Sequence, residues 1–165
     1  MRMLVLLCAA LVTLPAAAAD SKALIAKHWQ VAKEFTLAVA EAMPAESYDF
    51  KPNPEELSFG QLMIHIAAQN SDSCASATGT KPLAEPAAAD KQTAIRFLAD
   101  TFDKCAKELN AMAPEQLDKE VYQFRDQPVL AREALWYTFT HMAHHRGQAE
   151  VYLRVKNIKP PAWRF

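Results

Sequence analysis

Three histidines near the end of the chain carry the clearest chemical signal. His141, His144 and His145 stand in the run His-Met-Ala-His-His-Arg-Gly-Gln. A helix turns about 100° per residue, so His141 and His145 lie about 40° apart and can both reach one divalent metal ion. Two histidines at this spacing are more often packed or exposed than ligating. A third ligand is therefore needed before the pair predicts a metal site.

Two other histidines could supply that ligand. On a helix, His65 lies in a polar stripe formed by Ser58, Gln61, Gln69 and Asp72. The stripe either faces solvent or lines a wet cleft between helices, and the angular pattern favours solvent. His28 has no partner three or four residues away, so we interpret it as an ordinary, partly exposed histidine.

Three side chains are candidates to orient a ligand or a bound water molecule. Gln148 and Tyr152 share the helix face of the histidine pair, and Gln69 lies one turn after His65. Simple packing is the alternative for each of them. No acidic residue lies on the inner face of the last helix, and no serine stands in a Gly-x-Ser-x-Gly elbow. Any hydrolysis would therefore depend on the metal.

The elements that must position these residues are helices. Apolar residues at helical spacing predict four of them, separated by proline-containing breaks, at about residues 22–43, 57–75, 90–112 and 129–156. No stretch has the pattern of a strand. Four amphipathic helices with one core predict an all-α, four-helix bundle. After the last helix, Trp163 and Phe165 are expected to pack back onto the bundle.

Composition excludes several classes of function. The 165 residues have a net charge of −1, which provides no domain-wide basic surface for nucleic acid. Only three glycines occur, so the glycine-rich loops that bind phosphates or dinucleotides are absent. Hydrophobic residues make up 51% of the chain, enough to form a buried core.

The first residues are typical of a secretory signal peptide. Arg2 precedes an apolar run that ends at Leu14, and Ala17 and Ala19 form a small-residue cleavage site. The run is too short to span a bilayer. We therefore expect a signal peptide at 1–19, a domain at 20–165 without stable membrane insertion, and a periplasmic or secreted location.

Two cysteines, Cys74 and Cys105, remain after the expected cleavage. Thiols in an oxidising compartment tend to form disulfides. The sequence leaves open both a disulfide and two buried cysteines too far apart to join. Zinc binding is disfavoured because neither residue belongs to a closely spaced cysteine pair.

The chain resembles the DinB/YfiT-like metalloprotein family. The likeness rests on one histidine in the second helix and on the His-x-x-x-His pair that runs into His-Arg-Gly-Gln, and on residues Tyr48, Pro52, Ser58, Gly60, Leu62, His65 and Ala67. It covers nearly all of the mature chain. The resemblance implies a four-helix bundle, and many members of the family are dimers. It also implies that His65, His141 and His145 bind a divalent metal, zinc or nickel before manganese or iron.

The resemblance implies two activities on a small substrate, metal-dependent hydrolysis and thiol-dependent transfer. Three neutral imidazoles leave an ion with its positive charge and an open position, which suits catalysis. Export would separate the protein from the cytoplasmic thiols that such transferases use. A non-catalytic metal-binding or ligand-binding helical bundle, as a monomer or a homodimer, is the alternative.

Overall fold

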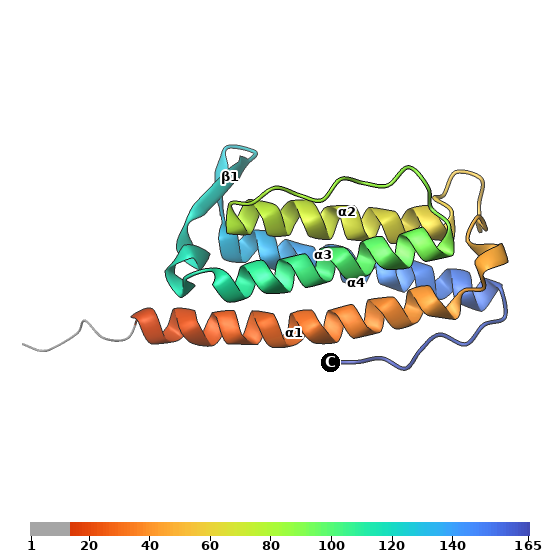
Figure 1. Ribbon diagram of the computed structural model, residues 1–165, viewed down its shortest axis with the longest axis horizontal. Helices are drawn as coiled ribbons and strands as arrows, with labels where there is room; N and C mark the ends of the chain where they lie inside the picture. Colours follow the sequence, from red (N-terminus) through yellow and green to blue (C-terminus); the bar gives the residue numbers. More distant parts are fainter. Residues whose placement is uncertain (1–13) are drawn as a thin grey trace, which may run out of the picture.

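The computed structural model describes residues 14–165, with side chains from Ala19 onward. Four helices lie side by side and form a single bundle (Figure 1). Their bounds are α1 Leu14–Ala42, α2 Phe59–Thr78, α3 Lys91–Ala111 and α4 Ala131–Val155. The expected all-α four-helix bundle is confirmed. No helix in the described part of the chain is long and apolar enough to cross a membrane.

The bundle does not alternate in direction. The loop 79–90 runs back along the length of the bundle, so α2 and α3 point the same way while α1 and α4 point the other way (Figure 1). One long crossover of this kind is a known variant of four-helix topology. As a result, α2 packs against both α3 and α4.

Local sequence signals set the ends of the helices. Ser58 caps α2 by accepting a hydrogen bond from the backbone of Gln61, whose side chain accepts one from the backbone of Ser58 in return. Gly79 ends α2 with a φ of 72°, a left-handed conformation that glycine adopts without strain. Asp90 caps α3 through the backbone of Thr93.

The first helix begins earlier than predicted. It starts at Leu14 instead of residue 22, because the alanine-rich stretch has high helix propensity and Pro15 is tolerated in a first turn. The helix therefore continues through the predicted cleavage point after Ala19. Residues 1–13 of the predicted signal peptide lie outside the described residues, and the signal peptide stays a prediction.

The absence of strands was a wrong expectation. Strands β1 (Glu120–Phe124) and β2 (Gln127–Leu130) form an antiparallel hairpin before α4. Both strands are largely exposed, so they lack the apolar alternation that marks a half-buried strand. Arg125 and Asp126 form the turn with φ values of 50° and 61°, without the glycine that usually signals such a turn. Short 3-10 turns at Ala45–Ser47 and Pro114–Asp118 complete the connections.

The core lies between the four helices. Its largest buried side chains come from every helix and include Trp29, Phe35, Phe59, Phe102 and Leu135. The indole nitrogen of Trp29 donates a hydrogen bond to the carbonyl oxygen of Phe102, which joins α1 to α3. Leu24 on α1 lies outside this core and is 57% exposed.

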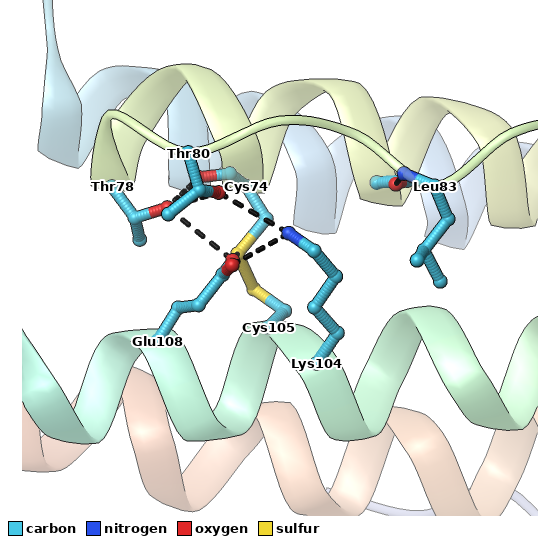
Figure 2. A network of polar contacts seen from close by, with 8 residues as sticks. Cys74, Thr78, Thr80, Leu83, Lys104, Cys105 and Glu108 are labelled. Atoms are coloured by element: carbon cyan, nitrogen blue, oxygen red, sulfur yellow. Dashed lines mark hydrogen bonds and ion pairs between the residues drawn. A yellow bond between two sulfur atoms is a disulfide. The ribbon is translucent and has the colours of Figure 1, made fainter.

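A disulfide between Cys74 and Cys105 joins α2 to α3, with 5.8 Å between the Cα atoms (Figure 2). Polar contacts surround it at the start of the crossover loop. The Glu108 carboxylate accepts a hydrogen bond from Lys104 at 2.6 Å, and Lys104 also donates to Thr80 at 3.2 Å. Of the two possibilities left open for these cysteines, the structure has the disulfide.

The chain turns back after α4. Asn157 has a φ of 57°, and the segment that follows runs beside α1 (Figure 1). Arg164 forms an ion pair with Glu34 at 3.3 Å, and the Phe165 ring lies 4.8 Å from that of His28. The expected return of Trp163 and Phe165 is therefore present, although both side chains stay mostly exposed.

Candidate metal centre

Three histidines meet between α2 and α4. The His65 ring lies 4.9 Å from that of His141 and 4.6 Å from that of His145, and the two α4 rings are 4.4 Å apart. The Nε2 atoms of His65 and His145 are 3.1 Å apart. Each residue offers one ring nitrogen to a set whose members all lie within 4.8 Å of one another.

The position of His65 follows from its place at the edge of a buried face. Its neighbours Leu62 and Ile66 are in the core, whereas Gln61 and Asp72 on the same polar stripe are exposed. His65 itself is half-buried and faces α4. The angular pattern alone favoured a solvent-facing stripe; at His65 the structure has the other alternative, a contact between helices.

Burial and mutual repulsion favour the uncharged forms of His141 and His145. The pKa of His141 is lowered from 6.5 to about 4. Burial is the larger cause, and the neighbouring imidazoles of His145, His65 and His144 contribute the rest. Burial also lowers the pKa of His145, against the opposing effect of its hydrogen bond to Gln148. A metal ligand must be a neutral imidazole, and the lowered pKa values of His141 and His145 favour that state.

Gln148 orients His145. Its Oε1 atom lies 2.7 Å from Nδ1 of His145, which assigns the proton to Nδ1 because a carbonyl oxygen only accepts. Nε2 of His145, the nitrogen that faces His65, is then unprotonated and can bind a metal. A partner of this kind on the second ring nitrogen is the usual support of a metal-bound histidine.

The other two candidates for this role bond elsewhere. Gln69 donates to the hydroxyl of Ser73, and the Tyr152 hydroxyl donates to the carbonyl oxygen of Leu57. Gln69 therefore bonds within α2, Tyr152 joins α4 to the residue before the α2 cap, and neither makes a hydrogen bond to the three histidines among the described contacts. Tyr152 does not reach the cluster because it lies two turns after His145, near the end of α4.

Two further residues lie beside the cluster: Tyr137, which was not predicted, and His144, which the sequence placed in the motif without a role. Tyr137, one turn before His141, places its ring 5.7 Å from that imidazole. His144 is exposed and lies 3.3 Å, through Nε2, from the side-chain nitrogen of Gln148. The four-residue spacing from Tyr137 to His141 and from His144 to Gln148 is the sequence signal that could have identified both.

The cluster fits a divalent ion. Nitrogen ligands at about 2.0–2.1 Å around tetrahedral zinc lie about 3.3 Å from one another, close to the His65–His145 separation. Nδ1 of His141 is buried without a hydrogen-bond partner, a cost that a native structure rarely leaves unexplained. Three imidazole ligands also suit nickel, copper or iron. The ligands therefore indicate a divalent transition metal or zinc, without distinguishing among them.

Comparisons with known proteins identify the family and the fold. The family model described as DinB family matches residues 18–163. No curated protein matches the sequence at a significant level.

Three solved structures resemble the fold. A DinB-like protein from Bacillus cereus has 21% identity and a TM-score of 0.74, and covers 85% of this chain and 95% of its own. One from Bacillus subtilis has 20% identity and a TM-score of 0.71, over 85% of this chain and 96% of its own. A conserved protein from Enterococcus faecalis has 20% identity and a TM-score of 0.65, over 80% and 94%. At this identity the likeness shows the fold alone.

Proposed function

Because this chain belongs to the DinB family, we propose that it binds one divalent metal ion through His65, His141 and His145 and acts on a small substrate there. The observation that carries the proposal is the meeting of three imidazoles from two helices within 4.8 Å. The buried, unpartnered Nδ1 of His141 supports it, because a polar atom in that position lacks any other compensation.

An ion held by three neutral imidazoles supplies positive charge and an open position, and so activates water for hydrolysis or binds a thiol for transfer. The protein contributes orientation and protonation state. Gln148 fixes the tautomer of His145, and burial keeps His141 neutral. In the described side chains no carboxylate forms an ion pair with the three histidines.

Hydrolysis is the activity we place first. Export would remove the protein from the cytoplasmic thiols that a transferase needs, and two features support export. The sequence begins with a basic residue and an apolar run of signal-peptide length, and Cys74 and Cys105 form a disulfide, a bond that persists in oxidising compartments. A non-catalytic metal-binding bundle is the second candidate, favoured because no acidic side chain among the described residues pairs with the three histidines.

Metal content of the mature protein, purified without a histidine tag, tests the proposal. We expect close to one equivalent of metal by mass spectrometry after dialysis. His65→Ala and the double variant His141→Ala/His145→Ala should each lose it. The matched control is His28→Ala. This substitution also removes a histidine, but the ring of His28 contacts Phe165 and lies outside the cluster.

Two results would overturn the proposal. One is an unmutated protein that stays free of metal after incubation with zinc, nickel and manganese. The other is metal that is retained in both variants. If the metal binds as expected, ester, amide and thiol-transfer substrates separate the enzyme from the non-catalytic bundle, because turnover should then depend on His65.

A further inference from the structure

An apolar groove lies between α1 and α4, on the side of α4 away from the histidine pair. It encloses about 460 Å³, within the usual size of small-molecule sites, about 300–1,000 Å³. Phe35 on α1 and Phe139 and Met142 on α4 line its depth, and Trp136, which is 69% exposed, stands at its rim. Exposed aromatic surface beside a groove is typical of a binding site.

The end of the chain forms the outer wall of this groove. Trp163 and Phe165 stack on each other with ring centres 5.6 Å apart, and Phe165 also contacts His28. The Arg164–Glu34 ion pair holds the segment against α1. Both aromatic side chains are more than 70% exposed, so their packing leaves apolar area available to a ligand.

Of the two arginines that line this apolar groove, Arg146 and Arg164, only Arg146 forms no ion pair among the described residues. The guanidinium carbon of Arg146 lies 4.2 Å from the centre of the Phe35 ring, and one of its nitrogens donates to the Thr36 hydroxyl at 3.4 Å. Among the described side chains, Arg146 forms no ion pair, whereas Arg132, Arg154 and Arg164 each do. A guanidinium has five N–H donors, and most of those on Arg146 are left without a protein acceptor.

We propose that this groove binds an amphipathic monocarboxylate. The apolar body would lie between the aromatic walls, where burial of hydrocarbon is favourable, and the carboxylate would pair with Arg146, whose planar fork matches it. A single negative charge is favoured over a phosphate monoester, because Arg146 is the one arginine of the groove that forms no ion pair among the described residues, and Glu150, four residues on, already offsets part of its charge. The site is separate from the histidine cluster and does not depend on a metal.

Titration of the whole mature protein with decanoate tests the proposal. Tryptophan fluorescence and calorimetry measure the binding. Two of the three tryptophans, Trp136 and Trp163, line the groove and should report binding. Below its micelle concentration, decanoate should bind at least about tenfold more tightly than 1-decanol, since one hydrogen bond to a charged group contributes about that ratio. Decylamine should bind more weakly than either.

Variants assign this preference to Arg146. Arg146→Gln should bring the affinity for decanoate down to that for decanol, and Arg146→Lys should keep part of the difference. Arg154→Gln removes an exposed arginine of the same helix and should change neither affinity. Ala143→Trp should fill the groove and weaken both ligands, with circular dichroism confirming that each variant is folded. His65→Ala should bind decanoate normally, which separates this site from the proposed metal site.

Three results would overturn the proposal. Equal affinities for decanoate and decanol would remove the role of the cation, and an unchanged Arg146→Gln variant would place the carboxylate elsewhere. The third is a groove occupied by a second copy of the chain. In that case sedimentation would show a dimer that Ala143→Trp dissociates and that decanoate does not affect.

Discussion

At the scale of single side chains, Gln148 determines which nitrogen of His145 is available. We predict that Gln148→Leu lowers metal affinity by about 10- to 100-fold, the usual effect of losing a partner on a ligating histidine. Competition with a chromophoric chelator measures the change. Gln69→Leu is the control, because Gln69 bonds only to Ser73 among the described contacts and should leave the affinity unchanged. Equal effects of the two substitutions would contradict the assigned role of Gln148.

The half-buried imidazole of His141 makes stability depend on pH. Its pKa is about 4 in the folded protein, against 6.5 when it is unperturbed, so the unfolded chain binds the proton more readily. The stability contributed by neutral His141 is therefore present above about pH 6.5 and is lost as the pH falls toward 4. His145, whose pKa is also lowered, acts in the same direction.

Urea unfolding of chelator-treated protein at several pH values from about 7 to 4.5 measures this dependence. We expect the free energy of unfolding to decrease with falling pH in the unmutated protein and to decrease less in His141→Leu. Identical slopes for the two proteins would show that other groups determine the acid sensitivity.

Residue types and spacing could predict part of the site. The four-residue spacing of His141 and His145 placed them together, but the angles on α2 left His65 facing solvent, and only the resemblance assigned it. The missing information is which edge of α2 meets α4. That depends on how the helices are arranged, which the periodicity of one helix does not contain.

At the scale of elements, two glycines in helices have opposite expected effects. A Cβ atom on Gly60, at the start of α2, would lie 1.9 Å from the carbonyl oxygen of Ala89. We therefore expect Gly60→Ala to lower the free energy of unfolding by about 1–3 kcal/mol, the usual cost of overpacking. A Cβ on Gly147 in α4 meets nothing within 4 Å.

Gly147→Ala is the matched comparison. It should raise stability by about 0.5–1 kcal/mol, because glycine in a helix interior loses more backbone entropy on folding than alanine. Urea denaturation of both variants measures the difference. A stable Gly60→Ala protein would mean that the 79–90 loop can move away from α2 at little cost.

The disulfide between α2 and α3 closes a loop over a sequence separation of 31 residues. Chain-entropy arguments give about 3–4 kcal/mol for a closure of this length. We predict that Cys74→Ser/Cys105→Ser loses stability of that order in chemical denaturation. Reductant should destabilise the unmutated protein by a similar amount and leave the double variant unchanged, and a reductant effect on the variant would point to another cause.

The helices could be predicted closely from periodicity, prolines and caps, and the hairpin could not. Its strands present few buried side chains, so the contacts that hold them are backbone hydrogen bonds, which leave no apolar pattern in the sequence. The early start of α1 was missed because the alanine run was assigned to a signal peptide, a role that a helical stretch does not exclude.

At the scale of the whole molecule, the length of one loop permits the direction that α3 takes. Extended chain spans about 3.3 Å per residue, so residues 79–90 can reach about 40 Å, whereas the 20-residue α2 is about 30 Å long. The loop is therefore long enough for α3 to run parallel to α2. It is also long enough for an antiparallel arrangement, so the sequence could predict four helices and one core but not their order in space.

Metal binding should stabilise the whole fold, because the three ligands join α2 to α4. A ligand present at about 100 times its dissociation constant adds about 2.7 kcal/mol when it binds only the folded state. We predict a higher melting temperature with zinc than with chelator, and no such difference in His65→Ala. A difference that persists in His65→Ala would indicate binding outside the histidine cluster.

The crossover loop and the disulfide together make this region tolerant of a break in the chain. Cys74 lies before the loop and Cys105 after it, so a cut anywhere between them leaves two fragments joined covalently. A protease recognition sequence inserted in the loop would give a nicked protein that migrates as one species until reductant is added. The two halves of the bundle could then be exchanged between differently labelled copies.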